Sequence, residues 1–279
     1  MPEDVALLAM ATSVARGAAE VIRTIRARGF TTTIKADTSP VTEADNASER
    51  YILQKLRAYR PDIAAIAEEE SAAGVHMETG QRYWLVDPLD GTRGFTEGRD
   101  HFAVNIGLVE GDQALLGAVV LPASGEVYAG GKGLGAWKIH ERTLPFDQTG
   151  AGTVQEGLRL LASATPIVAR TTPPDGVRML ASRYRRTSGF TDPQMLRWLQ
   201  GRHVHSVKRM GSAEKMVRVA EGSADFFPRL GPTMEWDTAA PQAIVEAAGG
   251  QLVDRSGEPL RYGKAGRLNH HFCCMGKGW

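Results

Sequence analysis

A short apolar strand runs directly into paired acids in the segment Trp84-Leu85-Val86-Asp87-Pro88-Leu89-Asp90-Gly91-Thr92. Two carboxylates three residues apart, held by a proline turn after a buried strand, raise each other's pKa unless a cation neutralises them. Hard oxygen ligands suit Mg²⁺, which proteins hold with a few carboxylates plus substrate phosphate and water. If Gly91-Thr92 opens a helix, its N–H groups and the Thr92 hydroxyl can bind a phosphate. The segment therefore predicts a joint site for metal and phosphate, with an Asp-rich turn as the structural alternative.

Three other acidic positions have structural explanations when each is taken alone. Glu68-Glu69-Glu70 follows an expected strand and is typical of a solvated charge run. Asp237, in Glu235-Trp236-Asp237-Thr238, precedes an apolar helix and could be its N-cap. Asp45 stands three residues after Thr42, where a capping box places an acid.

The composition is that of an ordinary globular protein. Of its 279 residues 42% are hydrophobic and 23% charged, and 33 Lys and Arg face 32 Asp and Glu. The near-neutral net charge therefore does not favour nucleic acid or an anionic membrane as a partner. We expect no membrane span, and Glu3 and Asp4 argue against an export signal. The two cysteines, Cys273 and Cys274, are adjacent, which disfavours a structural disulfide and indicates a reduced, cytoplasmic protein.

Hydrophobic periodicity predicts two helices and a meander of strands in the first half of the chain. The helices span 3–28 and 43–59, and the strands span 63–67, 83–86, 102–109, 114–121, 126–129 and 135–139. Glycines and a proline over 144–158 indicate a boundary. We therefore expect an N-terminal α+β subdomain over 1–150, which carries most of the metal ligands.

Strands and helices alternate in the second half, which we expect to form a C-terminal α/β subdomain over 151–279. It would carry Asp237 and the substrate-binding residues. Its expected strands span 159–163, 177–182, 203–207, 224–227 and 251–253, and its expected helices span 192–200, 212–221 and 237–248.

Four ordered segments resemble those of the lithium-sensitive inositol monophosphatase superfamily. The run 84–92 is similar to its first signature, and Glu235–Ala240 with Glu246–Gly250 to its W-D-x-A-A…A-G-G signature. Glu69-Glu70-Ser71 resembles its E-E-S metal segment, and Ser39-Pro40-Val41-Thr42-x-x-Asp45 its S-P-V-T-x-x-D segment. The resemblance covers nearly the whole chain and implies an α+β fold, a layered αβαβα sandwich.

Finer details resemble the 3′(2′),5′-bisphosphate nucleotidase branch, the CysQ-like enzymes. Arg93-Gly94-Phe95 follows Asp-Gly-Thr, where inositol monophosphatases usually continue to Asn-Phe. The run 227–233 and Gly211-Ser212-Ala213-x-Lys215 are also similar to that branch. One departure lies near Arg185, where CysQ-like proteins often have a histidine of the nucleotide pocket. It leaves open whether Arg185 alters base recognition.

The resemblance implies a Mg²⁺-dependent phosphatase that hydrolyses 3′-phosphoadenosine 5′-phosphate to AMP through a metal-activated water. It implies two or three Mg²⁺ ions, inhibition by Li⁺, and as metal ligands Glu69, Asp87, the Leu89 carbonyl, Asp90 and Asp237. Thr92, hydrogen-bonded to Asp45, would orient or deprotonate the water. The residues implied to bind substrate are Gly91, Thr92, Ser212, Lys215, Arg229 and Asp237.

Two alternatives remain at this point. The first is a relative in the same superfamily that acts on inositol phosphate or another small sugar or alcohol phosphate. The second is an inactive nucleotide-binding sensor, which the presence of every expected metal carboxylate and of Thr92 disfavours. The sequence leaves monomer and homodimer equally open.

Overall fold

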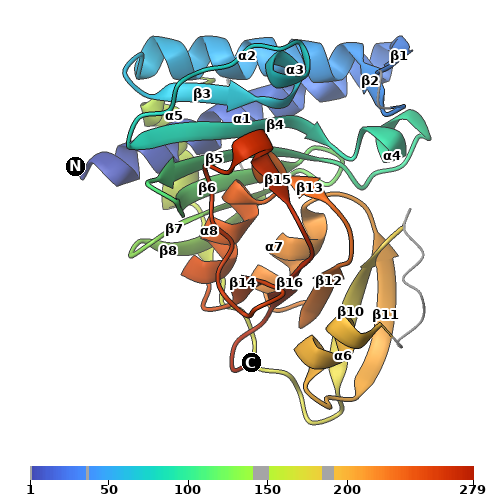
Figure 1. Cartoon of the computed structure of the whole chain (residues 1–279). Coiled ribbons are helices and arrows are strands. Elements are labelled where there is room, and N and C mark those ends of the chain that lie inside the picture. Colours follow the sequence, from blue (N-terminus) through green and yellow to red (C-terminus); the bar gives the residue numbers. More distant parts are fainter. Residues whose placement is uncertain (1, 36–37, 141–150, 184–191) are drawn as a thin grey trace.

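The computed structural model describes residues 2–35, 38–140, 151–183 and 192–279. Its main elements form alternating layers of helix and sheet, which are visible in Figure 1 from top to bottom. Two long helices cover one sheet, two shorter helices fill the space between this sheet and a second one, and a further helix covers the second sheet. The α+β class and the αβαβα sandwich are confirmed. The helices are α1 (Glu3–Arg28), α2 (Glu43–Tyr59), α3 (Glu68–Ala72), α4 (Thr92–Thr96), α5 (Val154–Ala162), α6 (Pro193–Leu199), α7 (Glu214–Ala220) and α8 (Ala239–Ala247).

The two long outer helices begin and end where the sequence predicts. Helix α1 has acids in its first turn and ends at Gly29, which has a positive φ of 83°. Helix α2 starts with the expected capping box, in which the Thr42 hydroxyl accepts the Ala44 N–H and Asp45 accepts the Thr42 N–H. Their apolar faces pack on the first sheet and on each other.

The first sheet has seven strands within the described ranges, in the order β3-β4-β5-β6-β7-β8-β9. Only β3 and β4 run parallel, and the other neighbours are antiparallel. Alternate residues of β4 serve opposite layers: Trp84 packs under α1 and α2, whereas Leu85 joins the core against α8. The strands are β3 (Ala64–Ala67), β4 (Arg82–Asp90), β5 (Ala103–Glu110), β6 (Gln113–Leu121), β7 (Glu126–Gly131), β8 (Gly135–His140) and β9 (Thr165–Pro166).

Helix α8 lies unusually close to this sheet. A Cβ added at Gly117 would lie 2.4 Å from the Ala240 carbonyl oxygen, and one at Gly107 would lie 2.6 Å from the Ala240 nitrogen. Glycine on the strands and alanine on the helix therefore let the two backbones nearly touch. This contact holds the start of α8, and with it Asp237, beside strand β4.

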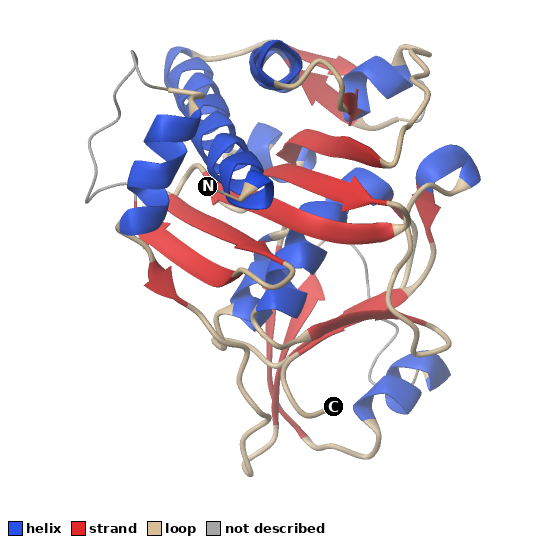
Figure 2. Ribbon diagram, turned by 90° about the vertical axis from the view of Figure 1, so that its left-hand side faces the viewer, coloured by secondary structure: helices blue, strands red, loops and turns tan. Residues whose placement is uncertain are grey.

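The second sheet has five strands in the described part of the chain, in the order β11-β10-β12-β16-β14. Phe226 faces α6, whereas Phe227 faces α7 and α8, so this sheet also separates two cores (Figure 2). Its strands are β10 (Val177–Ser182), β11 (Val204–Met210), β12 (Phe226–Arg229), β14 (Gln251–Asp254) and β16 (Phe272–Met275). The small pairs are β1 (Thr32–Ile34) with β2 (Pro40–Thr42), and β13 (Thr233–Met234) with β15 (Leu268–Asn269).

One expectation for the second half is wrong, and one strand of its sheet was not predicted. The predicted strand 159–163 lies mostly in helix α5, whose N-cap Thr153 accepts the Glu156 N–H. The apolar run alone could not distinguish strand from helix, and packing on α1, with a buried Arg16–Glu156 ion pair of 2.6 Å, decides for helix. Strand β16 was not predicted, although it lies between β12 and β14.

The division at residue 150 stays a prediction, because residues 141–150 lie outside the described ranges. The elements that follow it, α5 and β9, pack with α1 and β8 of the first sheet.

The expectation that no apolar segment reaches the length of a membrane span needs one correction. Helix α1 is long and apolar enough for a span by length and composition. However, 78% of its apolar window is buried inside the fold. Helix α1 is therefore a core helix of the first layer.

Candidate active site

Strand β4 carries two aspartates into the site across an interruption in its pairing. Asp87 pairs with Asn105 on β5, and the register then shifts before Asp90 pairs with Ala103. Pro88 lies in this interruption, where a residue without an N–H does no harm to the ladder. The Leu89 N–H donates to Asp87 Oδ1 at 3.0 Å, which fixes the turn.

Gly91 and Thr92 form the helix start that the sequence predicts. Gly91 has a φ of 97°, and a Cβ there would lie 2.9 Å from the His101 carbonyl oxygen. Both facts favour glycine. Helix α4 begins at Thr92, so its first N–H groups and the Thr92 hydroxyl come directly after Asp90.

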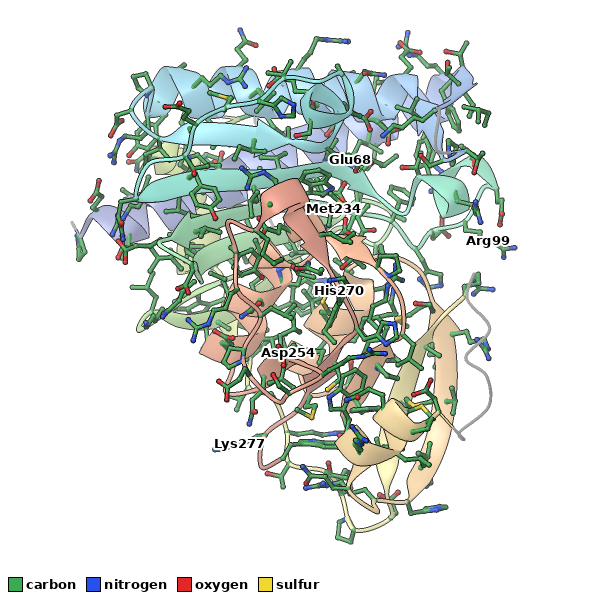
Figure 3. The ribbon with its side chains drawn as sticks, viewed as in Figure 1. Glu68, Arg99, Met234, Asp254, His270 and Lys277 are labelled. Atoms are coloured by element: carbon green, nitrogen blue, oxygen red, sulfur yellow. The ribbon has the colours of Figure 1, made fainter. Side chains whose placement is uncertain are left out.

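The third aspartate arrives from the other end of the chain. Asp237 ends the short 3₁₀ turn Glu235–Asp237, just before α8, and its Oδ2 accepts the Met234 N–H at 2.7 Å. Figure 3 labels Met234 at this turn and Glu68 at the layer above it. The site therefore joins the first layers of the fold to α8.

Asp87, Asp90 and Asp237 form a compact group, called here the acidic cluster. Each offers an oxygen, and these oxygens all lie within 4.8 Å of one another. Burial, with repulsion from neighbouring carboxylates, raises the pKa of Asp87 well above its usual value and that of Asp237 to about 7. A buried Asp87 beside two half-buried carboxylates favours a bound cation at neutral pH, and an all-oxygen set fits Mg²⁺.

The family resemblance implies Glu69 as the metal-binding glutamate, but its neighbour Glu68 has the stronger electrostatic effect on this cluster. The charge of Glu68 contributes to the raised pKa of Asp87 and Asp237. Glu69 accepts a hydrogen bond from Lys35 at 2.7 Å, and Lys35 also donates to Glu68 at 3.0 Å. Because strand β3 ends at Ala67, Glu68 is the first residue after it, and this position was the signal available in the sequence.

The predicted hydrogen bond between Thr92 and Asp45 is confirmed. Thr92 Oγ1 donates to Asp45 Oδ1 at 2.8 Å and lies 3.0 Å from the Leu89 carbonyl. The other oxygen of Asp45 accepts the Thr42 N–H and hydroxyl. Burial raises the pKa of Asp45, while the hydrogen bonds from Thr42 and Thr92 oppose the rise. Asp45 is thus a capping residue and a partner of Thr92 at once.

A cavity of about 360 Å³ opens beside the acidic cluster. It brings together the other residues predicted to bind substrate, and its lining includes Asp90, Gly91, Thr92, Ser212, Lys215 and Arg229. The backbone N–H of Ala213 donates to Asp90 Oδ2, which ties the 211–213 turn to the cluster. Burial lowers the pKa of Lys215 to about 8, and the charge of Asp90 opposes this shift.

Arg229 is held at the edge of this cavity by the main chain around it. Its guanidinium donates to the Pro232 carbonyl at 2.9 Å and to Ser182 Oγ at 3.3 Å. Its charge lowers the pKa of Asp90 and Asp237 against the effect of burial. The cavity lining therefore combines acidic and basic side chains.

The sequence analysis did not identify His101, which lines the same cavity. Its Nδ1 lies 2.7 Å from Glu214 Oε2, so α7 orients the ring. No motif signals this residue, because it precedes β5 in a polar loop. Arg185, named above as a departure from the CysQ-like pattern, lies outside the described residues.

Comparison with known proteins decides the family. The model of the inositol monophosphatase family matches residues 4–271. The chain belongs to the inositol monophosphatase family, in its CysQ branch.

The relatives that place it in this branch match over most of their length. The 3′(2′),5′-bisphosphate nucleotidase CysQ of Escherichia coli O157:H7 is 34% identical over 258 residues, or 92% of this chain and 94% of the relative. CysQ of Salmonella typhimurium is 36% identical over 82% of this chain and 81% of the relative. The crystal structure of CysQ from Bacteroides thetaiotaomicron superposes with a TM-score of 0.76 at 30% identity, covering 98% of this chain and 97% of the other.

Inositol monophosphatases share the fold as well. The enzyme from Anabaena matches with a TM-score of 0.68 at 24% identity over 97% of this chain and 90% of the other. With the acidic cluster, the family membership makes this CysQ-branch protein a metal-dependent phosphomonoesterase.

Proposed function

We propose that the protein is a Mg²⁺-dependent 3′(2′),5′-bisphosphate nucleotidase that hydrolyses 3′-phosphoadenosine 5′-phosphate to AMP and phosphate. The observation that carries this proposal is the cavity beside the acidic cluster, whose lining combines Asp90 with the cations Lys215 and Arg229. A substrate with two phosphates fits it, because one can meet the metal and the other the cations. The similarity to proteins named as bisphosphate nucleotidases supports the same substrate class.

The acidic cluster would hold two or three Mg²⁺ ions together with the Leu89 carbonyl and a glutamate of α3. Glu68 is the stronger candidate for that glutamate on charge, and Glu69 is the one implied by the motif. When bound, the ions would supply a nucleophilic water at neutral pH and neutralise charge on the leaving oxygen. Li⁺ could occupy such a site without supplying the charge of Mg²⁺, and we expect it to inhibit.

The chain's own groups account for the proton and for the charge on phosphorus. Thr92 and Asp45 orient the attacking water, and Asp45 Oδ1 accepts its proton through the Thr92 hydroxyl at 2.8 Å. The N–H groups of Gly91 and Thr92 bind the phosphate oxygens as charge develops. A bond forms from the water oxygen to phosphorus while the ester P–O bond breaks, and the leaving alkoxide takes a proton from a solvent water.

Lys215, Ser212 and Arg229 would bind the phosphate that is kept. Burial and a lowered pKa make the Lys215 ammonium a cation whose charge a second phosphate would stabilise.

Both cysteines, Cys273 and Cys274, are free and buried. A cytoplasmic location, as monomer or homodimer, belongs to the same proposal.

The test is phosphate release from a panel of phosphomonoesters at saturating Mg²⁺. We expect kcat/KM to be far higher for 3′-phosphoadenosine 5′-phosphate than for inositol 1-phosphate, fructose bisphosphate or histidinol phosphate. A higher value for inositol phosphate would move the protein to another substrate class, and no turnover of any ester would favour a nucleotide-binding sensor.

Arg229 sharpens this test. Replacing it by Ala should lower kcat/KM for the bisphosphate tens-fold more than for adenosine 3′-monophosphate, because a charge-assisted hydrogen bond to phosphate is worth about 1.5–3 kcal/mol. Arg229→Lys should recover part of the loss, since an ammonium cannot form a bidentate fork. Equal losses on both substrates would assign Arg229 to the fold or the metal site.

A further inference from the structure

Helix α2 presents three buried polar side chains on one face. Asp45, Ser48 and Glu49 are spaced i, i+3 and i+4, which places them side by side on a helix. Their exposed fractions are 2%, 0% and 4%. Buried polar groups of this kind are costly unless each has a partner.

Each of the three bonds a different segment of the site. Asp45 accepts the Thr92 hydroxyl of α4, as described above. Ser48 Oγ donates to the Pro88 carbonyl at 3.0 Å. Glu49 accepts two backbone N–H groups of α3, that of Glu69 at 2.7 Å and that of Glu70 at 2.8 Å.

Glu49 supplies a cap that α3 cannot supply itself. The N-cap position of α3 is Ala67, which has no side-chain acceptor, so the first-turn N–H groups need a partner from elsewhere. The Glu49 carboxylate takes two of them, one on each oxygen. This arrangement fixes the backbone at Glu69 and Glu70, directly after Glu68.

Ser48 acts in the same way on the other ligand-bearing segment. Pro88 lies between Asp87 and Leu89, within the interruption of the β4 pairing. Its carbonyl is therefore without the ladder partner that a regular strand would offer, and Ser48 holds it. This bond therefore anchors the backbone directly before Leu89, whose carbonyl accepts from Thr92 Oγ1 at 3.0 Å.

We propose that Ser48 and Glu49 are positioning residues, which align the α3 glutamates and the 87–90 segment against each other from one helix so that both can ligate the same metal. The inference rests on the proposed Mg²⁺ site. Partners in the outer shell of metal sites typically change metal affinity 10–100-fold when they are removed.

The decisive variant is Glu49→Gln, which keeps the size of the side chain but turns one acceptor into an NH₂ facing a backbone N–H. We expect its Mg²⁺ affinity, measured by calorimetric titration of the metal-free protein, to fall roughly tenfold or more. At saturating Mg²⁺ its KM for substrate should remain near that of the wild type. Ser48→Ala should weaken Mg²⁺ binding a few-fold, because it removes one neutral hydrogen bond.

Glu43→Gln is the matched control on the same helix. The Glu43 side chain is 40% exposed and pairs with Arg28, away from α3, so its Mg²⁺ affinity should be unchanged. If Glu49→Gln binds Mg²⁺ as tightly as Glu43→Gln, or only loses thermal stability, the positioning role is wrong. If the wild type binds no Mg²⁺, the proposed metal site itself fails. Should Glu49→Gln not fold, Ser48→Ala and Glu49→Asp provide the same comparison.

Discussion

The fold contains two groups of largely buried charged side chains, and they differ in how their charges are balanced. The acidic cluster gathers Asp87, Asp90 and Asp237 with raised pKa values. The second group, called here the Arg218 network, joins carboxylates with two cations. Its members are Arg218, Lys138, Glu126, Glu214, Glu221 and the Tyr128 hydroxyl.

In the Arg218 network every charge has an opposite partner. Arg218 contacts Glu126 at 2.5 Å and Glu221 at 2.9 Å, and Lys138 lies 2.6 Å from each of the same two glutamates. Burial alone would raise the pKa of Glu126, but hydrogen bonds from Arg218, Lys138 and Ser124 hold it well below its usual value. Each charged group of this network therefore has a partner of opposite charge within the protein.

The comparison shows which buried charges serve structure and which serve function. Natural proteins depart from local rules of polar satisfaction mainly at functional sites. The acidic cluster carries an excess of negative charge, which a divalent cation would neutralise. The following predictions test this division.

Asp87→Asn should have the largest effect. An amide keeps an oxygen for the Leu89 N–H but removes a metal-binding charge, so kcat/KM should fall about 1000-fold or more, as several kcal/mol of metal stabilisation is lost. In chelator, the melting temperature of the variant should match or exceed that of the wild type, because repulsion within the cluster is reduced. A clear drop in that temperature would mean that the carboxylate is structural.

Arg218→Met should reduce the stability of the fold, whereas Asp87→Asn should reduce activity. Removing this cation leaves three carboxylates of the network with Lys138 as their remaining cation. The free energy of unfolding should therefore fall by about 3 kcal/mol in denaturant titration. Arg60→Met is the control, since Arg60 pairs with Asp62, whose side chain is 60% exposed, and should cost about 1 kcal/mol or less. Similar losses for the two variants would show that the network is not a special source of stability.

Asp45→Asn separates proton transfer from capping. The amide oxygen can still accept from Thr42, and the NH₂ can donate to Thr92 Oγ1, whose hydroxyl then donates to the Leu89 carbonyl 3.0 Å away. Hydrogen bonding is kept, but the acceptor for the water's proton is lost. We expect kcat to fall roughly 100-fold with little change in melting temperature, and near-normal turnover would leave Asp45 only its role in the cap.

The smallest effect concerns pH. The pKa of Asp237 is raised in the folded protein to about 7, so the folded state binds more protons than the unfolded state between about pH 4 and 7. Its contribution is therefore fully present at low pH and is lost as the pH rises through 7. In chelator, melting should occur at a lower temperature at pH 8 than at pH 6, and Asp237→Asn should shrink this difference. A pH difference that Asn leaves unchanged would assign it to other groups.

Much of the fold was predictable because its signals are local. Helix α2 has a capping box at its first residues, and α1 has a glycine at its end, so both were placed at their observed limits. Helix α5 and strand β16 were missed because short apolar runs fit either element, and only their neighbours in space decide.

The site was predictable to the level of its motifs but not of its geometry. The segment 84–92 could be selected from its paired aspartates after an apolar strand, whereas Asp237 could be selected only through the resemblance of its segment to a family signature. The choice between Glu68 and Glu69 depends on how α3 is held against the cluster by Glu49, a contact twenty residues away in the chain. His101 carries no sequence signal at all.

The meeting of Asp87 with Asp237 also affects the order of folding. These residues are separated by roughly 150 positions, so closing the loop between them carries a large entropic cost before any metal can be shared. The 84–92 turn and its neighbours on β5 can form from nearby parts of the chain, whereas α8 must first dock on Gly107 and Gly117. We therefore expect the complete set of metal ligands to form late in folding. If the proposed Mg²⁺ binds only this complete set, it should slow unfolding and leave the folding rate nearly unchanged.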